Sequence, residues 1–162
     1  MSDVVVSRAT AKDWRTVRVV RLRALASDPG AFGSSLARER GFDDDVWRAR
    51  AAAGQTFLAI SGELAVGIVT LRVESGRERE RQLTSMWVAP EARGDGVGPR
   101  LVQAAGDAAA LEGALVLTLF VADGNDRARR FYERLGFRAT GERETLPSNP
   151  CLGEERYAIG LA

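Results

Sequence analysis

The sequence contains no histidine and a single cysteine, Cys151. Without histidine there is no Ser-His-Asp or Cys-His nucleophile system and no histidine-based metal site. One cysteine cannot form an internal disulfide or a CxxC metal knuckle. Cys151 lies in a proline-rich stretch and has no histidine to activate it, so we interpret it as a loop residue. We therefore expect neither a bound metal nor a cysteine nucleophile.

Long apolar runs are also missing, since no stretch approaches the ~18 apolar residues that a membrane-spanning helix needs. The first residues lack the charged region and long apolar region of a secretory signal. Lys+Arg total 23 and Asp+Glu total 22, so the net charge of +1 gives no basic field for nucleic acid. These absences predict a cytoplasmic protein without a nucleic-acid or membrane partner.

The chain has 162 residues, of which 45% are hydrophobic and 28% charged, and this composition predicts one globular domain over residues 1–162. Apolar periodicity and turn residues predict alternating strands and helices in the order βααβββαβαββ. The predicted strands cover residues 4–6, 56–60, 64–73, 83–88, 115–121, 137–140 and 156–161. The predicted helices cover residues 11–27, a segment following 43–45, a segment from about 99 to 113, and 125–135.

Two charged features have structural explanations. The triplet Asp43, Asp44 and Asp45 could suggest a metal site, but acids at a helix start cap its free amides and interact well with its dipole. Arg21 falls on the buried face of the first helix. We expect it to extend toward solvent or to meet a carboxylate at the core edge, with substrate binding as the alternative.

Residues 93–98 read Arg-Gly-Asp-Gly-Val-Gly and lie between an apolar run and the helix that starts near Pro99. Glycines give the backbone freedom and close ligand approach, and the helix start offers unpaired N–H groups, so the pattern predicts an anion-binding loop. A Walker loop is excluded because Gly98 is followed by Pro99 and Arg100. The glycine spacing and the late position in the chain also disfavour a dinucleotide fingerprint.

The loop and a second block together resemble a known family. Arg-x-x-Gly-x-Gly at 93–98 resembles the acetyl-CoA loop of the GCN5-related N-acetyltransferases, the GNAT family. Residues 125–137, Asn-Asp-Arg-Ala-Arg-Arg-Phe-Tyr-Glu-Arg-Leu-Gly-Phe, are similar to that family's Asn-x-x-Ala-x-x-Phe-Tyr-x-x-x-Gly-Phe segment. The two blocks occur in the family's order and spacing. The resemblance implies an α/β (α+β) GNAT fold, with a mixed sheet of about seven strands, splayed in the middle and flanked by about four helices.

The resemblance also implies a co-substrate and its binding residues. Acetyl-CoA is expected to donate an acetyl group to a primary amine of a small molecule or peptide within a ternary complex. The expected cofactor-binding residues are Met86, Trp87, Val88, Arg93, Gly94, Asp95, Gly96, Val97, Gly98, Asn125 and Tyr132. In this family the Val88 position donates a backbone N–H near the thioester oxygen, and the Tyr132 position is the catalytic acid for the departing thiolate.

The amine must lose a proton before it attacks, and the sequence offers no obvious base. Some family members carry a glutamate before the glycine loop, where this chain has Gln82, Leu83, Thr84 and Ser85. The proton could pass through water to Glu39, Glu80 or Glu142, or the amine could arrive neutral. Two alternatives therefore stay open: a regulatory acyl-CoA-binding domain, and a transferase for another acyl-CoA with Arg21 near the acyl group.

For the acceptor the resemblance implies entry between the loop after the first helix and the last hairpin. Here those segments are 32–39 and 142–155, with Phe32, Ser34, Glu39 and Glu142 as candidate acceptor-binding residues. The carboxylates of these segments favour a small cationic amine or polyamine, although a solvated charged loop would look the same. They are Glu39, Glu142, Glu144, Glu154 and Glu155. The identity of the acceptor stays open, as does the choice between a monomer and a homodimer.

Overall fold

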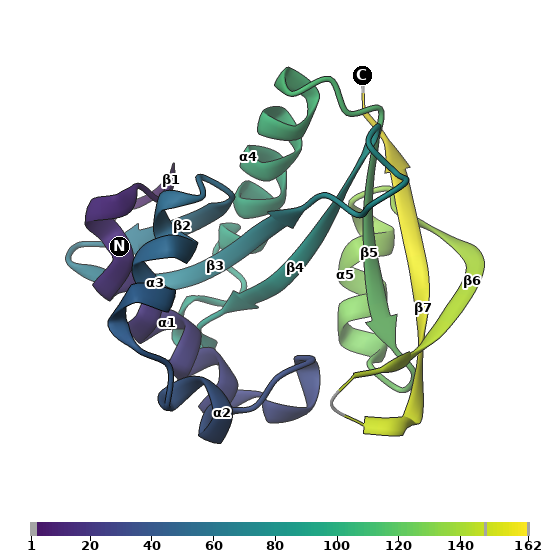
Figure 1. Ribbon diagram of the computed structural model, residues 1–162. Helices are drawn as coiled ribbons and strands as arrows, with labels where there is room; N and C mark the ends of the chain where they lie inside the picture. Colours follow the sequence, from purple (N-terminus) through teal and green to yellow (C-terminus); the bar gives the residue numbers. More distant parts are fainter. Residues whose placement is uncertain (1–2, 148, 162) are drawn as a thin grey trace.

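The computed structural model describes residues 3–147 and 149–161, whose strands form one seven-stranded mixed sheet in the order β1-β2-β3-β4-β5-β7-β6 (Figure 1). Neighbouring strands are antiparallel except β4 and β5. The strands are β1 (Val4–Arg8), β2 (Thr56–Ser61), β3 (Leu64–Arg72), β4 (Glu80–Val88), β5 (Val116–Ala122), β6 (Arg138–Leu146) and β7 (Asn149–Gly160). The α-helices are α1 (Trp14–Ser27), α2 (Leu36–Arg40), α3 (Asp44–Ala52), α4 (Val97–Leu111) and α5 (Asp126–Arg134). This architecture confirms the predicted fold class.

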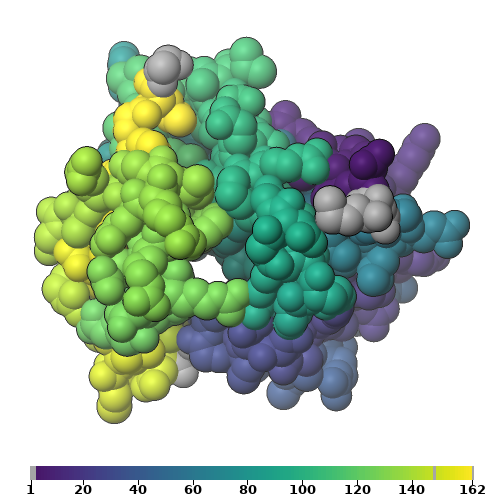
Figure 2. All heavy atoms as spheres, turned by 180° about the vertical axis from the view of Figure 1, so that it is seen from behind, coloured from purple at the N-terminus to yellow at the C-terminus, as the bar shows by residue number. Residues whose placement is uncertain are grey.

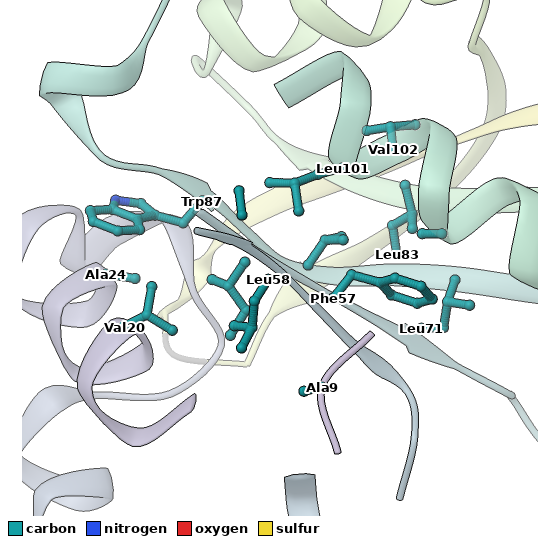
Figure 3. Packing of buried hydrophobic residues seen from close by; sticks show 14 of the residues in the cluster. Ala9, Val20, Ala24, Phe57, Leu58, Leu71, Leu83, Trp87, Leu101 and Val102 are labelled. Atoms are coloured by element: carbon teal, nitrogen blue, oxygen red, sulfur yellow. The ribbon is translucent and has the colours of Figure 1, made fainter. Parts of the chain in front are cut away.

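Helices cover both faces of the sheet and bury the apolar residues between them. Figure 3 shows Val20 and Ala24 of α1 on one side of the strands and Leu101 and Val102 of α4 on the other. All four side chains are buried, and burial of each large apolar side chain contributes about 1.5–3 kcal/mol. A Cβ added at Gly67 would lie 2.8 Å from Leu101 Cδ1, so the sequence has glycine where α4 crosses β3.

The two central strands separate along their length. β4 pairs with β5 only over residues 80–82 and 116–118, beyond which the two strands diverge (Figure 1). The pairing of β4 with β3 shifts by one residue at Ser85, which has a left-handed φ of 57°. Such a bulge bends the strand and costs a non-glycine residue about 1–2 kcal/mol. The second half of β4 therefore has an edge that faces a gap instead of a strand.

Two segments differ from the sequence-based expectation. Residues 36–40 form the short helix α2, capped by Ser35, whose Oγ accepts a hydrogen bond of 3.2 Å from the Arg38 N–H. The closing strands run through residues 138–146 and 149–160, whereas the predicted strands covered only 137–140 and 156–161. Glycine and proline in this stretch indicated a loop, but β6 lies at the sheet edge, where such residues are tolerated.

Candidate functional site

A cleft of about 550 Å³ lies between the end of β4, the loop that leads into α4, and α5. It contains most of the residues that the two sequence motifs single out. The motif residues that line the cleft are Met86, Trp87, Val88, Arg93, Gly94, Gly96, Val97, Gly98, Asn125 and Tyr132. Asp95, although it belongs to the same loop, is exposed and does not line the cleft.

The loop depends on glycine for its shape. Gly94 and Gly96 have φ values of 89° and 81°, and no atom lies within 4 Å of a Cβ added at either residue. The first-turn N–H groups of α4 follow directly at Val97 and Gly98, and helix geometry leaves them without intrahelical partners. The cleft therefore combines open backbone donors with the positive end of a helix dipole, an arrangement that suits a phosphate or pyrophosphate.

The start of α4 and the middle of α5 approach each other closely on one side of the cleft. A Cβ at Gly98 would lie 2.9 Å from both Cε1 and Cζ of Phe131. Gly98 therefore allows close contact between the two helices, in addition to any contact with a ligand. This packing brings the two sequence motifs together in space, although 26 residues lie between Gly98 and Asn125 in the sequence.

Asp28, at the end of α1, ties the loop to the end of β4. Its Oδ2 accepts hydrogen bonds from Trp87 Nε1 at 2.8 Å and from Arg93 Nη2 at 3.1 Å. The Nε of Arg93 donates to the Val88 carbonyl at 2.8 Å. Arg93 thus donates hydrogen bonds to two protein groups, the Val88 carbonyl and the Asp28 carboxylate. A long-range partner such as Asp28 leaves no signal in a single sequence.

The backbone of β4 offers hydrogen-bonding groups along the gap. Ala89 N–H donates to Val66 O on β3 at 2.8 Å. Because N–H groups of successive strand residues point to opposite edges, the Val88 N–H points away from β3 and toward the gap left by β5. An extended ligand lying in this gap could therefore pair with β4 as an added strand does.

A second cavity of about 520 Å³ adjoins the first. The two cavities share the lining residues Ala31, Met86, Asn125, Ala128 and Tyr132. Figure 2 shows an opening through the molecule between the green segment that includes α5 and the teal segment before α4. A ligand in the cleft and a ligand in the second cavity could thus meet at these shared residues.

Tyr132 lies at this junction and is 7% exposed. Its ring packs edge-on against Phe131, with centroids 5.0 Å apart, and against Phe137 at 5.6 Å. Burial raises the pKa of the Tyr132 phenol above its ordinary value of 10.0, so the group stays protonated at neutral pH. Asn125 caps α5, where its Oδ1 accepts from the Ala128 N–H at 3.2 Å.

The structure separates the four acceptor candidates. Phe32 and Ser34 line the second cavity, but Glu39 and Glu142 line neither cavity. The Glu39 side chain is 1% exposed and accepts from Arg21 Nη2 and Arg50 Nη1, each at 2.8 Å. Burial alone would raise the pKa of Glu39, but hydrogen bonds from the two arginines lower it to about 2. Glu39 is therefore an ion-pair partner of Arg21 and Arg50 and a poor base at neutral pH.

Arg21 is also explained by this network. Its Nη1 donates to Ser85 Oγ at 2.9 Å, while its Nε and Nη2 hold Glu39. This is the core-edge carboxylate that the sequence predicted for Arg21, and the contact to Ser85 also braces the β4 bulge. Arg21 lines the second cavity, and its positive charge is already paired with the carboxylate of Glu39.

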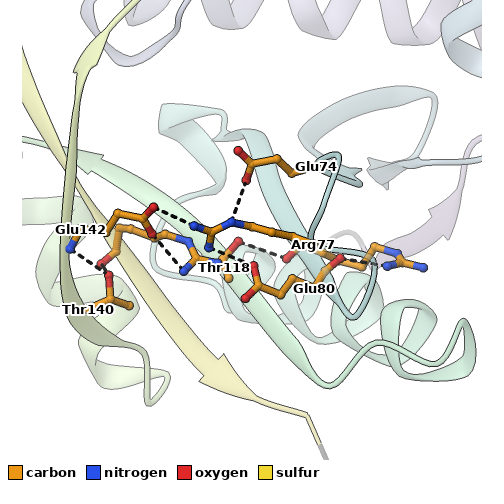
Figure 4. Close-up of polar contacts among 8 residues, drawn as sticks. Glu74, Arg77, Glu80, Thr118, Thr140 and Glu142 are labelled. Atoms are coloured by element: carbon orange, nitrogen blue, oxygen red, sulfur yellow. Dashed lines mark hydrogen bonds and ion pairs between the residues drawn. The ribbon is translucent and has the colours of Figure 1, made fainter.

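Glu142 lies in a separate ion-pair network between β6, β7 and the start of β4. Figure 4 shows its carboxylate beside Arg77, and the distances are 2.8 Å to Arg77 Nη2 and 3.2 Å to Arg156 Nη1. Glu80 pairs with the same two arginines. Because β6 is a strand here, Glu142 lies at the sheet edge, where two arginines hold its carboxylate and it lines neither cavity.

Two carboxylates of the expected acceptor segment 142–155, Glu144 and Glu154, do line the second cavity. They share one face because β6 and β7 form a continuous hairpin, whose length the proline and glycine residues concealed. Residues 3–147 and 149–161 contain no group of three Cys, Asp or Glu side chains arranged to hold a metal ion. In the same part of the chain, no helix is long and apolar enough to cross a membrane.

The fold and the cleft define an acetyltransferase-like α/β protein. The model of the Acetyltransferase (GNAT) family matches residues 20–137, and the chain belongs to this family. No match is found among curated protein sequences.

Solved structures agree with the family assignment. YncA from Salmonella typhimurium, solved with its cofactor acetyl-CoA, superposes with a TM-score of 0.75 at 19% identity, covering 99% of this chain and 95% of that one. The ribosomal-protein-S18-alanine N-acetyltransferase from Escherichia coli superposes with a TM-score of 0.71 at 16% identity, covering 99% of this chain and 95% of that one. Nourseothricin acetyltransferase superposes with a TM-score of 0.60 at 29% identity, covering 66% of this chain and 65% of that one. The first two similarities show the fold alone.

Proposed function

We propose that this protein is an N-acetyltransferase that moves an acetyl group from acetyl-CoA to a primary amine by direct attack in a ternary complex. The main observation behind the proposal is that two cavities meet at Tyr132. The glycine loop lines the first cavity, and the second could hold an acceptor. Support for acetyl-CoA comes from the family match and from its presence as the cofactor of the YncA structure.

The residues fit the coenzyme in three places. The amides of residues 94–98 would hold the pyrophosphate, and the open edge of Met86 to Val88 would pair with the pantetheine amides. Bound acetyl-CoA supplies the acetyl group as a thioester. The Val88 N–H is the donor that we assign to the charge developing on the carbonyl oxygen, and Tyr132 is the acid that we assign to the departing sulfur.

For the acceptor we favour a small molecule with a primary amine. Nourseothricin acetyltransferase is 29% identical over 66% of this chain. This similarity supports a small-molecule amine over a peptide N-terminus as the acceptor. Phe32 and Ser34 line the cavity that would hold such an acceptor.

The test combines acetyl-CoA titration calorimetry with thiol release in the presence of polyamines, aminoglycosides, nourseothricin, amino acids and short peptides. We expect acetyl-CoA to bind and thiol release to require an amine. Binding without amine-dependent thiol release would instead favour a regulatory acyl-CoA-binding domain. Preferential turnover of succinyl-CoA would favour a transferase for another acyl group.

A further inference from the structure

Two glutamates face the acceptor cavity without a basic partner. Glu144 on β6 and Glu154 on β7 are directly opposed in the antiparallel pairing, so both side chains project from the same face. Both residues line the second cavity, and Glu154 is 7% exposed. Directly opposed like charges destabilise a sheet, so this arrangement requires an explanation other than fold stability.

Other acids of this region each have an arginine. Asp123 and Glu155 pair with Arg143, while Glu80 and Glu142 pair with Arg156. In the part of the chain that the structure describes, neither Glu144 nor Glu154 forms an ion pair with a basic side chain, and the hydrogen bond of Glu154 is to Glu144 itself. Glu154 is therefore a nearly buried carboxyl group that lacks a basic partner, and the exposed Glu144 lies beside it, so the pair could accept a cation from outside.

The surroundings of the pair support a role in proton transfer. Burial, followed by the hydrogen bond and the negative charge of Glu144, raises the pKa of Glu154 to about 7. The groups around it are Ala122, which is its uncharged partner on β5, Arg156 two residues along β7, and Arg21 and Arg72 elsewhere in the cavity lining. Arg156 is matched by Glu80 and Glu142, and Arg21 by Glu39.

We propose that Glu154, with Glu144 beside it, binds the acceptor as a primary ammonium ion and is the base that deprotonates it. The proposal rests on the proposed acetyltransferase function and deepens it by naming a cationic acceptor and its base. It also provides the general base that is missing from residues 82–85.

The proton balance of the step is complete. The carboxylate of Glu154 takes one proton from the ammonium, which leaves a neutral amine whose lone pair forms the new N–C bond at the thioester carbonyl. The C–S bond breaks and its electron pair stays on sulfur. Tyr132 gives its proton to that sulfur and regains the second proton lost by the amine nitrogen, while Glu154 releases its proton to water. The products are the amide, the free thiol and one released proton.

The first experiment measures cation binding without turnover. Spermidine is titrated into the protein and followed by ¹H–¹⁵N NMR at Ala122 and Gly153, with 1,8-octanediol as an uncharged control. We expect saturable binding of spermidine only, weakened about 10-fold or more in Glu154→Gln. Glu155→Gln is the matched control, because its side chain lies on the opposite face of β7 and pairs with Arg143. Absence of spermidine binding, or equal binding by Glu154→Gln, would overturn the cation site.

The second experiment measures kcat/KM against pH with the best acceptor amine. We expect Glu154→Gln to lose about 100-fold or more, Glu155→Gln to stay within about twofold, and Glu144→Gln to move the acidic limb to lower pH. An unshifted limb in Glu144→Gln with full activity in Glu154→Gln would overturn the base assignment. Acetyl-CoA affinity measured on the same variants separates the two proposals, because failure of the parent protein to bind acetyl-CoA would defeat the proposed function itself.

Discussion

Tyr132 lies where the two cavities meet, and its burial keeps the phenol protonated. We expect Tyr132→Phe to lower kcat by about 100-fold, because the ring packing is retained and the proton donor is lost. Acetyl-CoA affinity should stay within about twofold of the parent value. Steady-state kinetics and calorimetry check both parts. Equal turnover for variant and parent would leave Tyr132 with packing against Phe131 and Phe137 as its only role.

Glu39 allows a stability prediction, because its carboxylate is buried between Arg21 and Arg50. Folding lowers its pKa from 4.5 to about 2, so its contribution is complete above pH 4.5 and is lost as the pH falls toward 2. We expect Glu39→Gln to lower the free energy of unfolding at pH 7 by about 3 kcal/mol.

Urea denaturation at pH 7 and at pH 3 measures this effect. The difference between Glu39→Gln and the parent should shrink at the lower pH. Glu91→Gln is the control, since the Glu91 pair with Arg23 is exposed and should contribute little. A variant as stable as the parent at pH 7 would show that the buried network does not stabilise the fold.

At the residue scale, local chemistry was predictable and long-range partners were not. Thr10 and Asp13 show such local chemistry, because they form a capping box at the turn 11–13 before α1, where Thr10 N–H donates to Asp13 Oδ2 at 2.7 Å. Arg21 was expected to meet a carboxylate, but Glu39 was expected to face an acceptor. The short helix α2 turns Glu39 inward, and five residues are too few for apolar periodicity to reveal such a helix.

Among the elements, the glycine loop and the start of α4 determine coenzyme binding. We expect Gly96→Asp to weaken acetyl-CoA binding by about 100-fold, because it adds a Cβ and a negative charge at a left-handed position beside the cleft. Gly62→Asp is the matched control. It introduces the same residue at φ 63° in the β2–β3 turn, away from the cleft. Calorimetry that gave the two variants equal affinity would refute the loop assignment.

The junction of α1, β4 and the loop gives a second prediction at this scale. Asp28→Ala removes the acceptor shared by Trp87 Nε1 and Arg93 Nη2 and should loosen the loop. We expect acetyl-CoA affinity to fall about 10-fold, a smaller loss than Gly96→Asp causes, because the backbone amides remain. Asp45→Ala, which removes only an exposed pair with Arg48, serves as the control. Unchanged affinity in Asp28→Ala would mean that the loop holds its shape without this contact.

Element positions were largely predictable because apolar periodicity identified all seven strands and the four longer helices. The errors lie at the last hairpin, where strands predicted at 137–140 and 156–161 extend to 138–146 and 149–160. Gly141, Pro147 and Pro150 give a loop signal that an edge hairpin overrides. The sequence placed Glu144 and Glu154 in the acceptor segment but did not show that they are paired, because their side chains share a face only if both strands continue.

At the scale of the whole molecule, the divergence of β4 and β5 joins the functional parts. It opens one edge of β4, exposes the space beneath Tyr132 and connects the two cavities. No periodicity in the sequence indicates where two strands separate. The family resemblance predicted it, and the left-handed Ser85 with its Arg21 contact gives a physical basis for the bend.

The most direct test of the account is amine-dependent release of free CoA from acetyl-CoA by the purified protein, with acetylated product measured by mass spectrometry. The account predicts equal amounts of thiol and acetylated amine with a cationic primary amine such as spermidine. It also predicts background release without an amine and near-background release with Glu154→Gln. Thiol release that is independent of amine, or no thiol release with any amine of the panel despite acetyl-CoA binding, would contradict it.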